Sequence, residues 1–396
     1  MRVVILGSTG SIGTQALNVI RTHPDRFEVI GLGAGGSQLE LLAAQAREFH
    51  VSTVAVANEN SADQLTELVP DVTVWAGGEA IAELAKLAGP NGIVLNGITG
   101  SVGLVPTLTA LHSGAQLALA NKESLVAGGK LVADAMVRPG QITPVDSEHS
   151  AIAQALRSGR HRKGLTCPEV DGSSEVARII LTASGGPFRG RTRAELQDVT
   201  AKQALKHPTW DMGPVVTINS STLMNKGLEL IEAAYLFDMP PQQIVPVVHP
   251  QSVIHSMVEF QDGSTIAQAS PPDMQLPIAL GLSWPDRLSQ VATPCSWDTA
   301  TSWEFEPLDA EVFPAVNIAR AAVAASPLHP AVMNAANEEA VAAFLADQIS
   351  YLAIIDIVEQ VLAEFSAPHN VDLTAVQTAE SWARRQAQTA ITKAVK

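Results

Sequence analysis

The stretch PVDSEHSAI places two acids, Asp146 and Glu148, two positions apart directly after a run that reads as a strand. In an extended chain the side chains at positions i and i+2 point to the same face, so the two carboxylates are expected to converge on one spot. Two like charges held close together repel each other, which favours a shared cation, a shared proton or wide separation in water. An exposed loop with ordinary surface acids explains this stretch equally well, so the rest of the chain has to decide.

A third acid, Glu229, stands in the run NSSTLMNKGLELIEAA. Helical spacing places it four residues after Asn225 and three after Lys226, so an amide, an ammonium and a carboxylate share one helix face. Together with the first two acids it would form an all-oxygen site, which suits Mg²⁺ or Mn²⁺ better than zinc. The alternative is a plain amphipathic helix whose polar side chains are solvated.

Polar residues also stand where two other expected strands end. LALANKESL ends a strand with Asn121, Lys122 and Glu123. Ligands of open α/β sheets bind at the carboxyl ends of the strands, so these residues are expected to face the nicotinamide side of a cofactor. TASGGPFRG places Ser184 before two glycines, a common form of phosphate- or hydroxyl-binding loop that is weak evidence by itself.

The run ALKHPTWDMG, residues 204–213, combines His207, Trp210 and Met212 between proline and glycine. A loop with one large aromatic ring and one thioether in that setting is expected to act as a lid, since lids exclude water and complete a site. A buried structural turn is the alternative.

The N-terminal run RVVILGSTGSIG carries Gly7, Gly10 and Gly13 on the turn from the first strand to the first helix. Glycines there let the backbone approach a pyrophosphate, and the helix N-terminus offers N–H donors and the positive end of its dipole. This strand-to-helix context is the one that the motif requires, so the turn predicts dinucleotide binding. A merely tight turn is the alternative.

The end of the second strand bears on the choice of cofactor. NAD sites usually carry an acid there that binds the ribose 2′-hydroxyl. The run GLGAGGSQ holds no acid before Glu40, which removes repulsion against a 2′-phosphate and favours NADP. No Arg or Lys stands beside it, so the available partners are Ser37 and the backbone N–H groups of Gly35 and Gly36.

Composition and charge exclude several classes of protein. The chain has 396 residues, of which 46% are hydrophobic and 16% charged, a composition typical of folded domains. A net charge of −15 argues against nucleic-acid or anionic-membrane binding, so an anionic substrate needs a local cluster of basic groups. The two cysteines lack disulfide or metal spacing, and neither a signal peptide nor a membrane-spanning apolar run is visible, which predicts a cytoplasmic protein.

The elements that must position these residues predict an α/β protein of two or three domains. Strands alternate with helices over 1–148, which predicts a Rossmann-like, doubly wound dinucleotide-binding domain. The strand-like runs RIILTAS, PVVTINS, IVPVVH and SVIHSMVEF predict a central α/β catalytic domain over 149–290, with the lid as a flexible flap. The Pro- and Trp-rich run 271–303 reads as connecting chain, with 291–310 taken as the connecting segment. Ala-rich helical periodicity over 311–396 predicts a C-terminal α-helical bundle.

The motifs together resemble one enzyme family, 1-deoxy-D-xylulose 5-phosphate reductoisomerase, essentially from end to end. The resemblance is carried in order by GSTGSIG, ALANKESLV, PVDSEHSAI, TASGGPFR, LKHPTWDMG, NSSTLMNKGLELIEA, HPQSVIHSMVEF and MNAANEEAVAAFL. Such a series of ordered motifs is a far more specific signal than any one of them.

The resemblance implies an enzyme that rearranges and reduces 1-deoxy-D-xylulose 5-phosphate to 2-C-methyl-D-erythritol 4-phosphate, in the non-mevalonate route to isoprenoid precursors. It implies NADPH and a divalent cation, Mg²⁺ or Mn²⁺ with Co²⁺ as a further option. It also implies a homodimer held by the central domain, a small phosphorylated deoxyketose as substrate, and neither nucleic acid nor membrane as partner.

The same resemblance implies roles for individual residues. It assigns the metal to Asp146, Glu148 and Glu229, and catalysis to these three with Lys122. It assigns substrate binding to Lys122, Ser147, Glu148, Ser184, His207, Trp210, Ser220, Asn225, Lys226 and Glu229. It assigns the cofactor site to Thr9, Gly10, Ser11, Ile12, Gly35, Ser37, Asn121, Glu123 and Gly213.

The chain departs from the family pattern in three places. Many members carry a basic or amide residue where this chain has Gly36 and Ser37, which leaves the contacts to the 2′-phosphate open. Ser150 stands where the pattern DSEHNA is usual. Residues 157–177 match poorly and are expected to be variable surface.

Two other functions fit parts of the sequence. A phosphorylating semialdehyde dehydrogenase also pairs a nucleotide fold with an α/β domain, but it needs a nucleophilic cysteine, and Cys167 and Cys295 lie in the poorly matching and connecting segments. A non-catalytic NADP sensor would keep the glycine turn but has no reason to keep three converging acids and a lysine-bearing helix.

Overall fold

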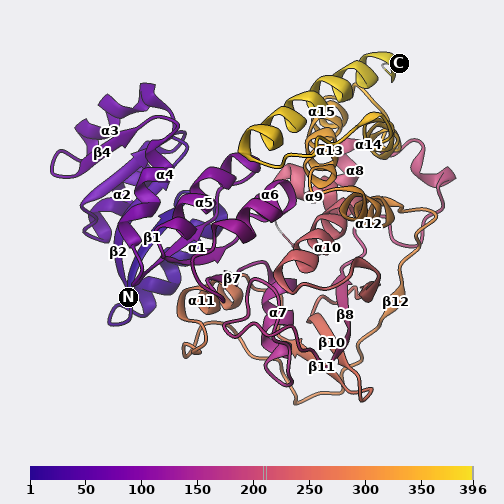
Figure 1. Ribbon diagram of the computed structural model, residues 1–396, viewed down its shortest axis with the longest axis horizontal. Coiled ribbons are helices and arrows are strands. Elements are labelled where there is room, and N and C mark those ends of the chain that lie inside the picture. Colours follow the sequence, from indigo (N-terminus) through magenta and orange to yellow (C-terminus); the bar gives the residue numbers. More distant parts are fainter. Residues whose placement is uncertain (208, 211, 395–396) are drawn as a thin grey trace.

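Two β-sheets and a bundle of helices form the framework of the computed structural model, which describes residues 1–207, 209–210 and 212–394 (Figure 1). The first sheet has the strand order β4–β3–β2–β1–β5–β6–β7, and all of its described pairings are parallel. Its strands are β1 Arg2–Leu6, β2 Glu28–Ala34, β3 Thr53–Val56, β4 Thr73–Ala76, β5 Gly92–Asn96, β6 Gln116–Leu119 and β7 Ile142–Pro144.

This first sheet confirms the doubly wound fold that the sequence predicts. Val3, Val4, Ile5 and Leu6 of β1 are all fully buried, because helices cover both faces of a parallel sheet. The helices that connect its strands are α1 Ser11–Thr22, α2 Leu39–Glu48, α3 Ala62–Leu68, α4 Ala80–Ala85, α5 Leu104–His112 and α6 Lys122–Ala135. The strand order reverses between β1 and β5, a point where such sheets open a ligand crevice at the carboxyl ends of the strands.

The second sheet has the order β11–β10–β8–β9–β12 and mixes parallel with antiparallel pairs. Its strands are β8 Val176–Ala183, β9 Ile244–Val248, β10 Ile254–Phe260, β11 Thr265–Ala269 and β12 Glu306–Pro307. The helices α7 Ser147–Leu156, α8 Ala201–Ala204, α9 Pro214–Ser221 and α10 Met224–Leu236 accompany this part of the chain. It corresponds to the central α/β part that the sequence predicts.

One of the predicted strands is wrong, because PVVTINS forms helix α9 Pro214–Ser221. Its β-branched residues suggested a strand, but Pro214 occupies the first turn, where proline is tolerated, and Gly213 precedes it. Thr217 and Ile218 are buried, and the helix packs against α10 and α13. Tertiary packing therefore overrides the local preference.

The C-terminal helices form the third part, as predicted. They are α12 Ala315–Ala325, α13 His329–Leu345, α14 Ala353–Glu364 and α15 Leu373–Ala394. α13 packs against both α14 and α15, and α12 packs against α10 of the central part. Figure 1 shows these helices, orange to yellow, above the second sheet and beside α6.

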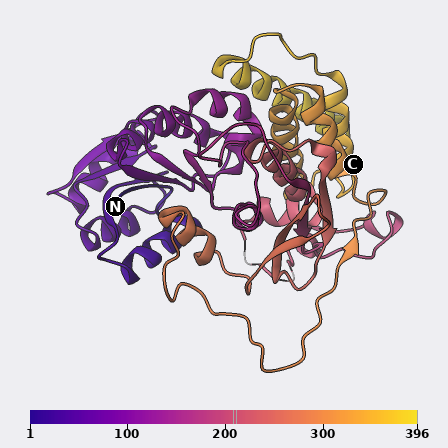
Figure 2. The ribbon, with the colours of Figure 1, turned by 60° about the horizontal axis from the view of Figure 1, so that its bottom comes forward.

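The run expected to be connecting chain contains a buried helix, α11 Gln275–Ser283, which corrects that expectation for its first half. Ile278 and Leu282 are fully buried and belong to the apolar core on one face of the first sheet, together with residues of β1 and α1. The helix lies beside the N-terminal part in Figures 1 and 2. The chain after it, up to β12, has no regular structure in the described residues and follows the outside of the molecule (Figure 2).

Within the ranges described above, no helix combines the length and apolar character needed to cross a membrane.

Candidate active site

The first two acids converge for a different reason from the one that their spacing suggested. Asp146 is the N-cap of α7, and its Oδ1 accepts a hydrogen bond from the backbone N of Ser147 at 2.9 Å. Glu148 lies in the first turn of that helix, where a negative charge faces the positive end of the dipole. The extended i, i+2 geometry is therefore wrong, and a helix N-terminus brings the carboxylates together instead.

The third acid lies on α10, as its spacing predicts. The Asn225 amide donates to Oε1 of Glu229, and the Lys226 ammonium donates to its Oε2. Glu229 is only 1% exposed, so these contacts replace water around a buried carboxylate.

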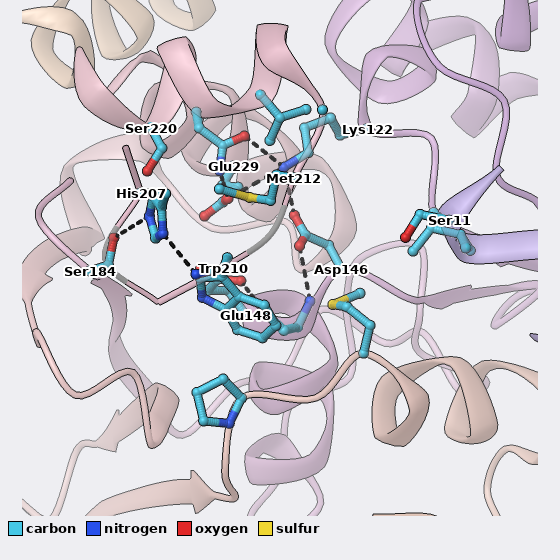
Figure 3. Close-up of a pocket in the computed structure, with 18 of the residues that line it drawn as sticks. Ser11, Lys122, Asp146, Glu148, Ser184, His207, Trp210, Met212, Ser220 and Glu229 are labelled. Atoms are coloured by element: carbon cyan, nitrogen blue, oxygen red, sulfur yellow. Dashed lines mark hydrogen bonds and ion pairs between the residues drawn. The ribbon is translucent and has the colours of Figure 1, made fainter. Parts of the chain in front are cut away.

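Ligand atoms of Asp146, Glu148 and Glu229 all lie within 4.8 Å of one another (Figure 3). Two lysines bind the group from either side. Lys122 Nζ lies 2.9 Å from Asp146 Oδ2 and 3.3 Å from Glu229 Oε1, and Lys226 Nζ lies 2.6 Å from Glu148 Oε1. Three acids face two ammonium groups, so the cluster carries a net negative charge when all three acids are ionised.

The neighbouring charges decide the protonation of these groups. Burial works to raise the pKa of Asp146, but the charge of Lys122 and the facing His149 outweigh it and hold the pKa well below its usual range. Burial also opposes ionisation of Glu148, yet Lys226 lowers its pKa. Burial and the charge of Glu148 raise the pKa of Glu229, which lies deepest.

The donor set fits a hard divalent cation. Carboxylate oxygens are the ligands that Mg²⁺ and Mn²⁺ prefer, and the cluster supplies three from separate side chains. A divalent cation would more than balance the excess negative charge. Its charge would also favour the ionised form of the buried Glu229, whose pKa is raised without it.

Ser184 and Ser220 line the cavity that also contains the three acids, at another end of it. The ring of His207 accepts hydrogen bonds at Nδ1 from the backbone N of Thr209, at 3.1 Å, and of Trp210, at 2.9 Å. In the neutral ring Nε2 therefore carries the hydrogen, and it lies 3.0 Å from Ser184 Oγ, which accepts it. Gly186 N also donates to this Oγ, at 3.3 Å, so the serine hydroxyl hydrogen remains available to a ligand.

His207, Trp210, Met212 and Gly213 line the cavity that holds the three acids, and Figure 3 shows Trp210 and Met212 beside them. The indole ring of Trp210 lies 6.3 Å from the ring of His255, between centroids. Pro208 and Asp211, which belong to the predicted flap, lie outside the described residues.

The glycine turn lies at the far end of the cavity, with Ser11 in Figure 3 on the opposite side of the acids from Ser184. Gly10 is the N-cap of α1 and provides no side-chain cap, and the first turn holds no acid, so the helix N-terminus is open to an anion. Gly7 has a φ of +81°, and a Cβ there would lie 2.8 Å from the carbonyl oxygen of Gly97. Only glycine fits that approach of the turn to β5.

One cavity of about 730 Å³ contains most of the residues that the sequence singled out. The predicted residues that line it are Gly10, Ser11, Ile12, Lys122, Glu123, Asp146, Ser147, Glu148, Ser184, His207, Trp210, Gly213, Ser220, Asn225, Lys226 and Glu229. None of its described lining residues is a cysteine, which removes the nucleophile that a semialdehyde dehydrogenase needs.

Four predicted cofactor residues do not line this cavity. Thr9 stands next to it in the glycine turn, whereas Gly35 and Ser37 are exposed beyond the end of β2. Asn121 is buried below the cavity: it caps α6, and its amide donates to the carbonyl oxygens of Ile98, at 2.6 Å, and Gly100, at 2.9 Å. Its direct contacts are thus with the protein.

Several lining residues were missed from the sequence, among them Thr99, Ser252, His255 and Met274. They stand in loops between elements or on the second sheet. His255 lies in the quoted run HPQSVIHSMVEF, which was the only signal that could have pointed to it.

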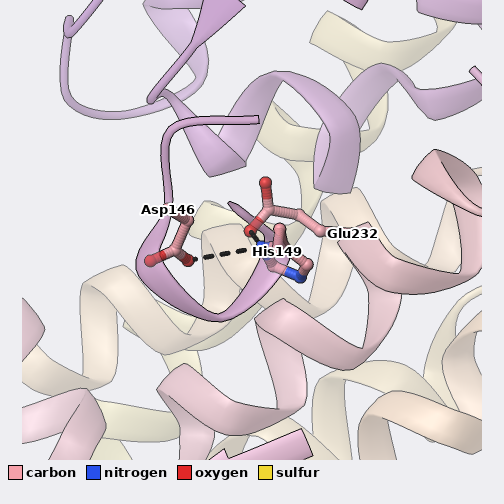
Figure 4. A group of neighbouring side chains, drawn as sticks. All are labelled: Asp146, His149 and Glu232. Atoms are coloured by element: carbon pink, nitrogen blue, oxygen red, sulfur yellow. Dashed lines mark ion pairs between the residues drawn. The ribbon is translucent and has the colours of Figure 1, made fainter. Parts of the chain in front are cut away.

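His149 and Glu232 were also missed, and they lie against Asp146 (Figure 4). His149 is fully buried and Glu232 is 2% exposed. Burial would lower the pKa of His149, but Glu232 and Asp146 raise it to about 9. Burial raises the pKa of Glu232 to about 8. The histidine does appear in PVDSEHSAI, but only the fold reveals its partner on α10.

Comparison with known proteins gives one family along the whole chain. Three family models match the chain in order. The model described as 1-deoxy-D-xylulose 5-phosphate reductoisomerase matches residues 3–129, and the model of the C-terminal domain of that enzyme matches residues 142–237. A third model, described as the DXP reductoisomerase C-terminal domain, matches residues 269–386. The 1-deoxy-D-xylulose 5-phosphate reductoisomerase of Beutenbergia cavernae is 60% identical over 392 residues, which cover 98% of this chain and 96% of the relative. That of Bifidobacterium longum subsp. infantis is 57% identical over 401 residues, covering 99% and 98%.

Solved structures agree with the sequence comparison. The reductoisomerase from Zymomonas mobilis in complex with NADPH has a TM-score of 0.88 at 39% identity, covering 98% of each chain. A crystal structure of DOX-P reductoisomerase in complex with NADPH, fosmidomycin and magnesium has a TM-score of 0.87 at 34% identity, covering 99% of this chain and 98% of that one. The chain therefore belongs to the 1-deoxy-D-xylulose 5-phosphate reductoisomerase family.

Proposed function

We propose that this chain converts 1-deoxy-D-xylulose 5-phosphate to 2-C-methyl-D-erythritol 4-phosphate, by a rearrangement and a reduction that depend on NADPH and a divalent cation. This reaction supplies the non-mevalonate route to isoprenoid precursors. The observation that carries the proposal is one cavity in which three carboxylates and two lysines stand between a helix N-terminus and a pair of serines. The relatives that contain NADPH, fosmidomycin and magnesium support it.

The cation would be held by Asp146, Glu148 and Glu229. When bound, it supplies a Lewis acid that polarises the carbonyl and adjacent hydroxyl oxygens of the ketose. Lys122 stays charged beside the acids, because the burial that would lower its pKa is outweighed by Asp146, Glu229 and Glu232, which raise it. Its ammonium thus donates hydrogen bonds to oxygens in this part of the cavity and moves no proton at neutral pH.

The substrate would lie between the acids and the two serines. Ser184 and Ser220 would donate to the phosphate, with His207 holding the Ser184 hydroxyl in the donating orientation. The residues that would contact the ketose and its hydroxyls are Lys122, Ser147, Glu148, Asn225, Lys226 and Glu229. Trp210 would cover the reacting carbons and exclude water from them.

NADPH would lie along the carboxyl ends of β1 and β2 and supplies the hydride when bound. Gly10, Ser11 and Ile12 would receive its pyrophosphate on the N-terminus of α1. The remaining predicted cofactor residues, Thr9, Gly35, Ser37, Asn121, Glu123 and Gly213, would line its path toward the acids or support it.

We also propose that two copies of the chain associate and act in the cytoplasm. The edge strand β11 of the second sheet supports the association, since most of its residues are exposed and such edges pair readily. Sedimentation that yields the mass of one chain at micromolar concentration would contradict it.

NADPH oxidation, followed by absorbance, tests the proposed function. It should require both Mg²⁺ or Mn²⁺ and the phosphorylated deoxyketose. The Glu229→Gln variant should lower kcat/KM by more than about 100-fold, because residues that merely support a metal ligand are already worth about 10- to 100-fold. Its affinity for NADPH should persist, because Glu229 lies on α10, whereas the glycine turn joins β1 of the first sheet to α1.

The exposed Glu359 on α14 offers a matched control, and Glu359→Gln should behave as the wild type. Oxidation of NADPH without the cation, or unchanged turnover in Glu229→Gln, would refute the assignment of the metal. Equal loss of NADPH affinity in Glu229→Gln would refute the separation of the two sites.

A further inference from the structure

A buried pair stands behind Asp146, on the side away from the cavity. His149 lies in the first turn of α7, and Glu232 lies one turn beyond Glu229 on α10. Neither lines the cavity, and both point toward Asp146 in Figure 4. The proposed function gives this pair no role, although burying a histidine and a carboxyl group costs free energy unless each is hydrogen-bonded or paired.

The hydrogen bond at one end of the ring determines what the other end presents. His149 Nε2 lies 2.9 Å from the backbone oxygen of Glu229. A carbonyl oxygen can only accept, so Nε2 carries a hydrogen. The opposite nitrogen, Nδ1, faces Oε2 of Glu232 at 3.5 Å and Oδ2 of Asp146 at 3.6 Å.

A bare lone pair on Nδ1 would repel both of these oxygens. A single hydrogen on Nδ1 turns this repulsion into attraction, because the two oxygens share it, Oε2 of Glu232 at 3.5 Å and Oδ2 of Asp146 at 3.6 Å. Nδ1 and Oε2 of Glu232 have no hydrogen-bond partner among the described residues, so each is free to take this part. Glu232 on one side and the Glu229 carbonyl on the other thereby fix the orientation of the ring against Asp146.

Asp146 then contacts a basic side chain on each of two sides. Lys122 holds its Oδ2 from the cavity side at 2.9 Å, and His149 faces it from the buried side. His149 also ties α7 to α10 through the Glu229 carbonyl, so the pair links the elements that carry the three acids.

We propose that Glu232 is a positioning residue that acts through His149 to fix the Asp146 carboxylate, and so strengthens the binding of the divalent cation. This inference rests on the proposed function, because it takes Asp146 as a cation ligand. Partners behind a metal ligand orient it, and their loss costs about 10- to 100-fold in metal affinity or activity.

A second cation between Asp146, His149 and Glu232 is the competing explanation, since one atom from each lies within 4.8 Å of the others. A second cation would have to share the carboxylate of Asp146 with the first, and Oδ2, the oxygen that faces His149, already accepts a hydrogen bond from Lys122.

The test is the affinity for Mn²⁺ without turnover, measured from the electron paramagnetic resonance signal of free aqueous Mn²⁺ during titration. Glu232→Gln keeps the size of the side chain and removes its carboxylate. It should raise the Kd of Mn²⁺ about tenfold or more, while the Kd of NADPH stays within twofold. Glu232→Asp keeps a shorter carboxylate and should recover part of the loss.

Ser150→Ala is the matched control, since Ser150 is buried beside His149 on α7 and its hydroxyl forms a hydrogen bond only with Gln154 among the described residues, at 3.4 Å. A lower Tm in Glu232→Gln with unchanged Mn²⁺ affinity would show a merely structural role and overturn the inference. If Glu232→Gln does not fold, Glu232→Asp takes its place. Its shorter carboxylate should still raise the Kd of Mn²⁺ above that of the wild type, so an unchanged Kd overturns the inference.

The remaining outcomes separate this inference from the proposed function. A wild type that takes up two Mn²⁺ ions, and a Glu232→Gln variant that takes up one, would overturn the positioning role in favour of a second cation. A wild type without Mn²⁺ affinity, or a Glu229→Gln variant that binds as the wild type does, would instead refute the proposed function.

Discussion

Neighbouring groups, more than residue type, determine the chemistry of the side chains in this cavity. Asp146 and Glu229 are both buried carboxyl groups, yet the pKa of Asp146 is lowered because Lys122 and His149 outweigh its burial, whereas burial and the charge of Glu148 raise that of Glu229. The same reasoning applies to His207, whose backbone contacts require a neutral ring.

The first prediction at this scale concerns the pH dependence of the His207 loop. Burial lowers the pKa of His207 below its usual value, so the folded loop favours the neutral ring. This contribution is complete above the ordinary pKa of about 6.5 and is lost as the pH falls through the lowered one. Protonation of Nδ1 removes the acceptor for Thr209 and Trp210, so Trp fluorescence should change below about pH 6.5.

Two substitutions test the roles of Nδ1 and Nε2 of His207 separately. Asn places an acceptor near the position of Nδ1 and does not titrate, so His207→Asn should keep the loop and show no acid transition. Gln places its amide near the position of Nε2, so His207→Gln should resemble the acid form at every pH. Trp210→Phe identifies the signal, because the chain has 6 tryptophans. An acid transition of full size in His207→Asn would refute the argument.

At the scale of elements, the C-terminal helices hold the helix that carries Ser220. The hydroxyl of Tyr351 donates to the backbone oxygen of Ser221 at 2.7 Å, and the amide of Asn337 donates to Oδ1 of Asn219 at 2.9 Å. Both bonds are buried and reach the residues on either side of Ser220. A part of the chain that lines none of the cavity therefore sets the position of a proposed phosphate ligand.

Tyr351→Phe should accordingly raise the KM for the substrate with little change in kcat. The change leaves a buried carbonyl without its donor, which costs roughly 1–3 kcal/mol, and a loss of about 1 kcal/mol in binding is about fivefold in KM. The other tyrosine of the chain, Tyr235, is a matched control, since its hydroxyl forms no hydrogen bond with the described residues. Equal KM values in Tyr351→Phe and Tyr235→Phe would show that the contact does not reach the site.

The sequence predicts elements best where one signal dominates. β1 has the bounds expected from RVVIL, because five apolar or flanking residues end at a glycine turn. β4 was missed because it is a short edge strand with half-exposed residues, and α9 was mistaken for a strand because packing overrides its β-branched residues. The convergence of Asp146 and Glu148 was predicted from an extended spacing that the helix N-terminus of α7 contradicts, whereas the helical spacing around Glu229 was right. Glu232 could not be predicted, because its partner lies on a different element.

At the scale of the whole molecule, neither the charge nor the path of the chain divides evenly among the three parts of the fold. The chain carries a net charge of −15, yet the N-terminus of α1 at one end of the cavity has no acid in its first turn and offers the positive end of its dipole to an anionic ligand. The chain also leaves the first sheet after β7, forms most of the second, and returns as α11 to pack against β6 and α1 before it leaves again. The apolar core on one face of the first sheet therefore includes residues more than a hundred positions beyond the last strand of that sheet.

This path predicts that α11 unfolds with the first sheet and not with the parts adjacent to it in sequence. Ile278 is fully buried in the core that it shares with β1 and α1, so Ile278→Ala should cost about 2–5 kcal/mol. The lost stability should appear as faster amide hydrogen exchange in β1, β5 and α11, measured by mass spectrometry of peptides, with a weaker affinity for NADPH. Ile354→Ala on α14 is the matched control, because Ile354 is equally buried in the core of the C-terminal helices and should speed exchange in α13 and α14 instead. If Ile278→Ala speeds exchange in β10 and β11 while β1 and β5 keep their protection, α11 belongs energetically to the second sheet, and its place in the first core is only a contact.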